Sequence, residues 1–317
     1  MNSPTPIEPS PNKPYLARRS HCSQFISLRG LRHHLLRWGE DSPGSASQPP
    51  LVLLHGWMDV GASFQFVVDA LTSQRRIIAM DWRGFGLSDS SGADSYWFPD
   101  YLGDLDALLD QISPDAPVDL LGHSMGGNVV MNYAGLRPQR IRRLINLEGF
   151  GLPDAAPDLA PERLTTWLDE LKEPPQLKPY TSLQAVAQRL IKTNPRLTHD
   201  KAAWLAPHWS RKVVRPDGGL EWQILGDPAH KRTNPVLYRR AEVMACWSRI
   251  AAPTLWVEGK STAVLRWFGD RYPRADFEER IALVPQLRRE VLEEAGHMLH
   301  HDQPEALARI LEDFLAD

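Results

Sequence analysis

Short runs of consecutive apolar residues alternate along this chain with segments in which apolar residues recur every three or four positions. The runs lie at residues 51–54, 77–80, 118–121, 144–147 and 254–257. Each is typical of a strand buried on both faces of a parallel sheet. Helical spacing follows, with Leu105, Leu108 and Leu109 on one side of one segment and Leu307 and Leu311 on one side of another. This alternation predicts an α/β fold, a mostly parallel sheet with helices on both faces.

The remaining segments predict how the chain is organised around that sheet. Residues 25–28 and 31–38 predict an antiparallel start to the sheet, and residues 287–292 predict its last strand. Prolines, helical segments and scattered tryptophans, without strands of the core type, characterise residues 152–247. We therefore expect the following organisation: a flexible tail at 1–22, a core formed by 23–151 and 248–317, and an inserted, mainly helical cap at 152–247.

Ser124 stands between two glycines in the sequence GHSMG at residues 122–126, directly after the apolar run at 118–121. An abrupt turn from strand to helix strains the backbone, and a Cβ at Gly122 or Gly126 would collide with the adjoining elements. The N-terminus of the following helix would then stabilise negative charge on an atom bonded to Ser124. The pattern predicts a nucleophilic serine. The same short sequence also occurs in tight turns that have no catalytic role. The segments around it are therefore needed to distinguish the two interpretations.

A second segment at a strand end supports the chemical interpretation. The apolar run at residues 51–54 leads directly into His55, Gly56 and Trp57. A loop at this position is suited to donate a backbone N–H to an oxyanion on the serine adduct. We therefore assign the oxyanion hole to the backbone N–H groups of Trp57 and Met125. We expect His55 to be a structural hydrogen-bonding residue rather than a base.

A third segment, DWRGFGLSD at residues 81–89, follows the run at 77–80, and we expect its charges to brace a glycine-punctuated loop. With HGWMD at 55–59 and GHSMGG at 122–127, the chain resembles the α/β-hydrolase superfamily. Within it, the chain is similar to the serine hydrolase-like proteins, which combine an HGW-D segment near an ASF stretch, here residues 62–64, with a GHS-x-GG elbow. The likeness covers nearly everything after about Phe25. It implies an α/β-hydrolase sheet and a triad in the chain order serine, acid, histidine.

The base implied by this resemblance comes late in the chain. His297 follows Gly296 at the exit of the predicted strand 287–292, where a loop can fold over the sheet edge towards the serine. His300 and His301 lie further along, before a helix, and we expect both to be structural. His297 is therefore the predicted base.

The position of the predicted triad acid differs from the commoner family pattern. The family typically places an aspartate soon after the strand at 254–257, but here Glu258 and then GKST follow, without an aspartate. The strand before it ends at Glu148, and haloalkane dehalogenases, of the same superfamily, carry their catalytic glutamate at this strand end. We predict Glu148 as the acid that orients His297 and keep Glu258 as the alternative. A carboxylate at Glu148 that only braces a loop is the remaining hypothesis.

The nucleophile decides the expected reaction. Dehalogenases and epoxide hydrolases attack with a carboxylate, whereas a serine at position 124 favours acyl transfer, because a serine ether is not readily cleaved by water. We therefore expect a serine hydrolase that cleaves a small-molecule carboxylic ester through an acyl-enzyme. Two alternatives stay open: the same triad acting on a thioester, an amide or a carbon–carbon bond next to a carbonyl, and a non-catalytic ligand-binding protein that retains the fold.

Composition narrows the class further. The chain has 317 residues, of which 42% are hydrophobic, enough for one catalytic domain with an insertion, and its net charge of -3 argues against a general nucleic-acid binder. Its two cysteines, Cys22 and Cys246, form no disulfide framework, and no signal-peptide pattern or membrane-spanning run is present. The histidines show no metal-binding spacing. We expect a soluble cytoplasmic enzyme without metal or organic cofactor; the oligomeric state stays open.

Overall fold

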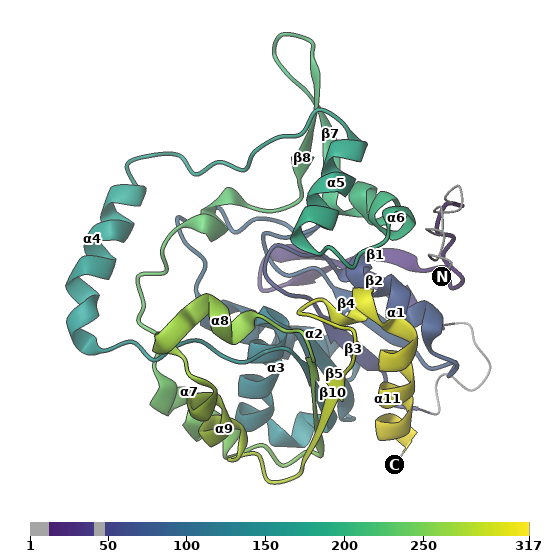
Figure 1. The fold of residues 1–317 in the computed structure, drawn as a ribbon, viewed down its shortest axis with the longest axis vertical. Coiled ribbons are helices and arrows are strands. Elements are labelled where there is room, and N and C mark those ends of the chain that lie inside the picture. Colours follow the sequence, from purple (N-terminus) through teal and green to yellow (C-terminus); the bar gives the residue numbers. More distant parts are fainter. Residues whose placement is uncertain (1–12, 41–47, 317) are drawn as a thin grey trace, which may run out of the picture.

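An eight-stranded sheet forms the centre of the computed structural model, which describes residues 13–40 and 48–316 (Figure 1). The strand order is β1-β2-β4-β3-β5-β6-β9-β10. The strands are β1 (Cys22–Leu28), β2 (Leu31–Trp38), β3 (Leu51–Leu54), β4 (Ile77–Met80), β5 (Val118–His123), β6 (Ile141–Leu147), β9 (Thr254–Gly259) and β10 (Leu287–Leu292). Neighbours pair in parallel except for β1 with β2 and β2 with β4. The predicted mostly parallel sheet with an antiparallel start is confirmed.

The central strands are buried on both faces, and alternate residues supply two separate hydrophobic cores. In β3, Leu51 and Leu53 belong to one core, whereas Val52 and Leu54 belong to the other. All four side chains are at most 1% exposed. Successive side chains of a strand point to opposite faces, so a strand covered by helices on both sides has to be apolar throughout.

Helices cover both faces of the sheet (Figure 1). One core contains α1 (Gln65–Ala70) and α11 (Pro304–Ala316), and the other contains α2 (Phe98–Ile112), α3 (Met125–Leu136) and α9 (Arg274–Ile281). Two short helices, α8 (Val264–Phe268) and α10 (Leu299–Asp302), lie in the loops that follow β9 and β10. Among the described residues, no helix is both long and apolar enough to cross a membrane.

The segment inserted between β6 and β9 is mainly helical, but it also contains a hairpin that the sequence did not predict. It contains α4 (Ala160–Glu170), α5 (Leu183–Thr193), α6 (His199–Trp209), β7 (Ser210–Val214), β8 (Leu220–Ile224) and α7 (Arg240–Trp247). Figure 1 shows α5, α6 and the β7–β8 hairpin on one side of the sheet, with α4 set apart from them. The last helix of the segment, α7, packs against α3, and the Trp247 indole donates to Asn132 at 3.1 Å. The predicted cap, residues 152–247, therefore ends with a helix that packs against the core.

Part of the predicted N-terminal tail is held against the core. The Tyr15 ring contacts the Phe66 and Trp204 rings at centroid distances of 5.0 and 5.7 Å. The backbone N–H groups of Arg18 and Arg19 donate to the Asp69 carboxylate at 2.9 and 2.8 Å. Residues 13–21 therefore differ from the expected flexible tail, because α1 offers them an acceptor and an aromatic surface. The rest of that tail, residues 1–12, lies outside the described residues.

Candidate active site

Ser124 lies at the abrupt turn between β5 and α3. Its backbone has φ 53° and ψ −115°, a conformation that L-residues rarely adopt. A Cβ on Gly122 would lie 2.3 Å from the Gly126 carbonyl oxygen, and one on Gly126 would lie 2.2 Å from the Leu54 carbonyl oxygen. Both positions therefore require glycine, for the reason given by the sequence pattern. The turn leaves the serine side chain half-buried at the carboxyl end of the sheet.

His297, from the loop after β10, meets the serine. Its Nε2 lies 3.0 Å from the Ser124 Oγ, and its Nδ1 lies 3.2 Å from an oxygen of Glu148. The three residues come from loops that follow β5, β6 and β10. Parallel strands place their carboxyl ends at one edge, which is how residues 149 positions apart come together.

Glu148 is held by more than the histidine. Its carboxylate is buried and accepts hydrogen bonds from the Gly259 N–H at 2.7 Å and the Thr262 hydroxyl at 2.5 Å. Its backbone has φ 60°, which turns the chain sharply at the end of β6. Gly259 and Thr262 belong to the segment in which the family pattern places an aspartate. In this chain that segment supplies donors to the glutamate of the neighbouring strand.

Glu258, the alternative acid, faces other partners. Its carboxylate accepts from the Arg274 guanidinium at 3.0 Å and from the Trp256 indole N–H at 3.1 Å. Within the described residues, no hydrogen bond joins Glu258 to His297. Of the two candidate carboxylates, only Glu148 is brought to the imidazole.

The two residues assigned to the oxyanion hole belong to segments that adjoin the serine. Met125 is the first residue of α3, so its N–H belongs to the helix N-terminus, where no preceding carbonyl within the helix is available. On the other side, a Cβ on Gly56 would lie 3.1 Å from the Ser124 Cβ, which places the backbone before Trp57 against the serine. Met58, the next residue, has φ 55°. The tight loop thus keeps the Trp57 backbone beside Ser124.

His55 makes structural hydrogen bonds. Its Nδ1–H donates to the Gly56 carbonyl at 2.7 Å, and its Nε2 accepts from the Trp82 backbone N–H at 3.1 Å. The Trp82 indole donates in turn to the His55 carbonyl at 2.9 Å. Burial lowers the pKa of His55, so the ring is neutral at pH 7. It ties the loop after β3 to the loop after β4.

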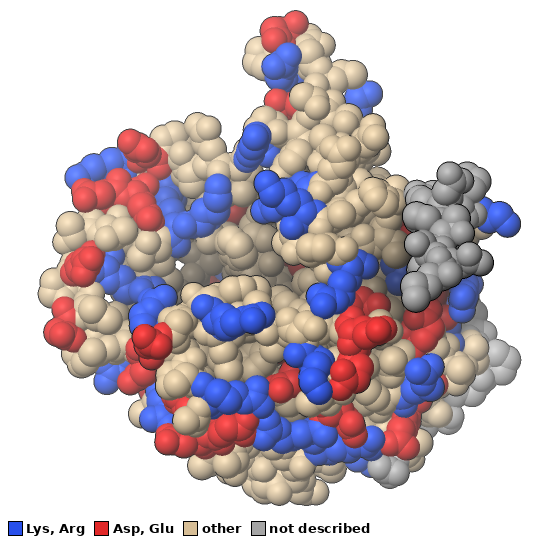
Figure 2. All heavy atoms as spheres, viewed as in Figure 1, with Lys and Arg blue, Asp and Glu red and all other residues tan. Residues whose placement is uncertain are grey.

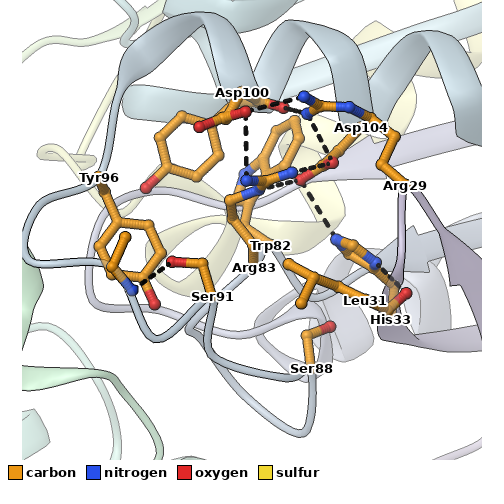
Figure 3. Close-up of polar contacts among 12 residues, drawn as sticks. Arg29, Leu31, His33, Trp82, Arg83, Ser88, Ser91, Tyr96, Asp100 and Asp104 are labelled. Carbon is orange, nitrogen blue, oxygen red and sulfur yellow. Dashed lines mark hydrogen bonds and ion pairs between the residues drawn. The ribbon is translucent and has the colours of Figure 1, made fainter.

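The charged loop after β4 is braced as the sequence predicts (Figure 3). Arg83 binds both oxygens of Asp104 of α2 at 2.5 Å, and Arg29 and His33 each add a contact of 3.2 Å to the same carboxylate. Burial alone would raise the pKa of Asp104, but the hydrogen bonds from Arg83 and His33 outweigh it and lower the pKa. This buried charge cluster fixes the loop that lies beside His55.

Three further residues contact the site without having been predicted. His123, the last residue of β5, donates from Nε2 to the His297 carbonyl at 2.8 Å, and burial holds its pKa well below the usual value. The Trp267 ring of α8 lies 5.1 Å from the His297 ring, edge to face. Thr262 binds Glu148, as described above. The sequence offered one indication of His123, because it directly precedes Ser124. No local pattern indicated Trp267 or Thr262.

The surface is hollowed between the inserted segment and α8, the helix that carries Trp267 (Figure 2). Two contacts join the inserted segment to the loops of the site. A Cβ on Gly226 would lie 3.3 Å from the Met58 methyl carbon, and a guanidinium nitrogen of Arg196 lies 3.3 Å from the corresponding position on Gly296. The inserted segment thus borders both the loop that carries Trp57 and the loop that carries His297.

Comparisons with known proteins agree with this architecture. The model of the α/β hydrolase fold family matches residues 49–304, so the chain belongs to that family. A serine hydrolase-like protein from Danio rerio is 26% identical over 88% of this chain and 86% of its own length. A cis-3-alkyl-4-alkyloxetan-2-one decarboxylase from Shewanella oneidensis is 27% identical over 70% of this chain and 71% of its own length.

Among solved structures, the thioesterase domain from the curacin biosynthetic pathway superposes with a TM-score of 0.78 at 27% identity. The match covers 93% of this chain and 99% of that domain. Other relatives are named as esterases. The chain is therefore an enzyme of the α/β-hydrolase class, with relatives among ester-cleaving enzymes.

Proposed function

We propose that this chain is a serine hydrolase that cleaves a small or medium-sized hydrophobic carboxylic ester through an acyl-enzyme. The observation that carries the proposal is the pair of distances at the imidazole, 3.0 Å to the Ser124 Oγ and 3.2 Å to Glu148. The nucleophile is hydrogen-bonded to a base, and the base is hydrogen-bonded to an orienting acid. This arrangement activates a hydroxyl at neutral pH. In this proposal Ser124 is the nucleophile, His297 the base and Glu148 the acid.

The first half of the reaction acylates the serine. Glu148 accepts the Nδ1–H of His297, which leaves the lone pair on Nε2 facing the Ser124 hydroxyl. Nε2 takes the hydroxyl proton as Oγ attacks the ester carbonyl. The backbone N–H groups of Trp57 and Met125 bind the oxyanion of the tetrahedral intermediate. His297 then returns the proton to the leaving alcohol, and the acyl group stays on Oγ.

The second half repeats these steps with water. His297 removes a proton from a water molecule, whose oxygen attacks the acyl carbon, and the same backbone groups bind the second oxyanion. Collapse of this intermediate returns the proton to the Ser124 Oγ and releases the carboxylic acid. Each proton that leaves an attacking oxygen is returned to a leaving oxygen, so the enzyme ends unchanged.

We assign substrate selection to the inserted segment, acting as a cap. Its contacts with Met58 and with the backbone beside His297 support this role. Open α/β sheets bind ligands outside the carboxyl ends of their strands, and the segment borders that edge. Residues of α5 and of the β7–β8 region would then determine which acyl groups fit.

A second candidate function uses the same catalytic residues but cleaves a different bond of the substrate. A relative named as a decarboxylase and a structural neighbour named as a thioesterase favour testing thioesters and carbon–carbon bonds next to a carbonyl. In each case the serine attacks a carbonyl carbon and the leaving group differs. Rates on p-nitrophenyl esters, acyl thioesters and β-diketones of the same acyl length separate these possibilities.

Labelling with a fluorophosphonate probe tests the proposal directly. We expect one probe per chain, on Ser124, and loss of both labelling and ester turnover in Ser124→Ala without loss of the folded state. Ser248→Ala, at an exposed serine after α7, is the matched control and should label as the natural chain does. A folded chain that neither labels nor turns over any of the panel would instead be a non-catalytic binding protein.

A further inference from the structure

A second group of polar side chains lies buried beside the proposed active site and has no part in the mechanism above. Asp59 follows the loop of Trp57, and His300 and His301 are the second and third residues of α10. One ligand atom from each of the three lies within 4.8 Å of the others, and the His300 Nε2 is 4.0 Å from the Asp59 Oδ2. Two histidines and a carboxylate converge on one point inside the protein.

The polar atoms of this group lack partners. In the part of the chain that the structure describes, both ring nitrogens of His300, both of His301 and the Oδ2 of Asp59 have no hydrogen bond. The two rings are 0% and 3% exposed, and Asp59 is 7% exposed. Buried polar groups are nearly always paired, because leaving one unpaired costs about 1–3 kcal/mol. One ring nitrogen of each histidine and one carboxylate oxygen of Asp59 lie close together, and a single bound ion would satisfy these three atoms.

The group is prepared for a cation. The Ser63 hydroxyl donates to the Oδ1 of Asp59, which leaves Oδ2 as the free oxygen on the histidine side. Each histidine places one ring nitrogen within the group, and a neutral imidazole offers a lone pair to a metal ion.

We propose that Asp59, His300 and His301 form a binding site for one divalent transition-metal ion, with Zn²⁺ as the best fit. Two imidazoles and one carboxylate are a common ligand set for Zn²⁺, which leaves a fourth position for water. Bond lengths of about 2.0–2.2 Å require the ligand atoms to approach more closely than their present 4.0 Å and 4.8 Å. Metal binding therefore requires the side chains to rotate towards one another.

The ion would join two loops that also carry the proposed catalytic groups. Asp59 lies two positions after Trp57, and His300 lies three positions after His297. The His300 ring also contacts the His123 ring at a centroid distance of 4.5 Å, and His123 is bonded to the His297 carbonyl. A bound ion thus stabilises the relative position of these loops. It is not required to contact the substrate.

The sequence did not reveal this site because its ligands are far apart in the chain. His300 and His301 are adjacent, which matches no metal-binding motif, and the third ligand, Asp59, lies more than 200 positions earlier. The expectation of a protein without metal rested on local spacing alone.

Cobalt titration tests the proposal without using enzyme activity. The purified chain, stripped with a chelator, is titrated with Co²⁺ and followed by its visible absorption, which distinguishes a four-coordinate from a hydrated ion. We expect one equivalent to bind, displaceable by Zn²⁺, and a higher melting temperature with Zn²⁺ present. His301→Asn and Asp59→Asn each remove a direct ligand and should weaken Co²⁺ binding by at least the roughly 10- to 100-fold that loss of an outer-shell partner costs. His199→Asn, at an exposed histidine of α6, is the matched control and should bind as the natural chain does.

Two results would overturn the proposal. The first is a folded natural chain that binds no equivalent of Co²⁺, since the group would then hold only water. The second is binding that His297→Ala abolishes and His301→Asn preserves, because the ion would then be bound at the proposed triad. Circular dichroism and melting temperatures of each variant without metal separate loss of a ligand from loss of the fold.

Discussion

Replacing Glu148 by glutamine tests which carboxylate orients His297. The two oxygens of Glu148 receive three donors: the Gly259 N–H faces Oε1, while the Thr262 hydroxyl and the His297 Nδ1 face Oε2. A glutamine has one oxygen and one NH₂ group to offer. With the NH₂ at the Oε2 position, a donor faces Nδ1 and favours the tautomer with its proton on Nε2, which cannot accept the serine proton.

The other amide orientation is also costly. It places the NH₂ group against the Gly259 N–H, two buried donors facing each other, and removes the negative charge that stabilises the imidazolium. The equivalent substitution in a serine protease triad lowers kcat about 10⁴-fold. We expect kcat of Glu148→Gln to fall about 10³- to 10⁴-fold, or about 4–5.5 kcal/mol of transition-state stabilisation. KM should change little, because no substrate contact is removed.

Glu258→Gln is the matched control at the other strand end. Its partners are Trp256 and the partly exposed Arg274, and ion pairs of this kind contribute about 0–1 kcal/mol. Its kcat should stay within about threefold of the natural chain. Both variants are assayed on one p-nitrophenyl ester, at a temperature below the melting temperature of each. The reasoning fails if Glu148→Gln keeps more than about a tenth of the natural kcat, or if Glu258→Gln loses as much.

Two predictions concern the fold. Gly126→Ala places a Cβ 2.2 Å from the Leu54 carbonyl and should cost about 3 kcal/mol or more in urea unfolding; Gly92→Ala, at φ 68° with open space around it, should cost only about 1 kcal/mol. Equal losses would refute the steric explanation. Burial lowers the pKa of His230 to about 4, so the folded state disfavours the protonated ring. The neutral ring's contribution to the free energy of unfolding is complete above pH 6.5 and is lost as the pH falls towards 4. His230→Phe should therefore lessen the fall in unfolding free energy between pH 6.5 and 4 by up to roughly 3 kcal/mol, and an unchanged slope would contradict it.

Local sequence patterns were sufficient for most of the fold. The continuous apolar runs identified β3, β4, β5 and β9, because a strand covered on both faces has no polar side. The β7–β8 hairpin was missed, since its strands are largely exposed and lack such a run. The packing of residues 13–21 was also missed, because Asp69 and Phe66 that hold them lie in a different element.

The sequence by itself determined that Ser124 sits in a strained turn, because an apolar run followed by a serine between two glycines is readable within a few consecutive residues. It did not determine which glutamate meets His297, since Glu148 and Glu258 both end a buried strand. The tertiary structure decided this: Gly259 and Thr262 aim their donors at Glu148, and Arg274 draws Glu258 away. It likewise brought Asp59 to His300 and His301. The glycine pattern of the turn is readable locally, even though Leu54 of another strand also excludes a side chain at Gly126. Hydrogen-bond partners, in contrast, depend on how strands and loops distant in sequence are placed.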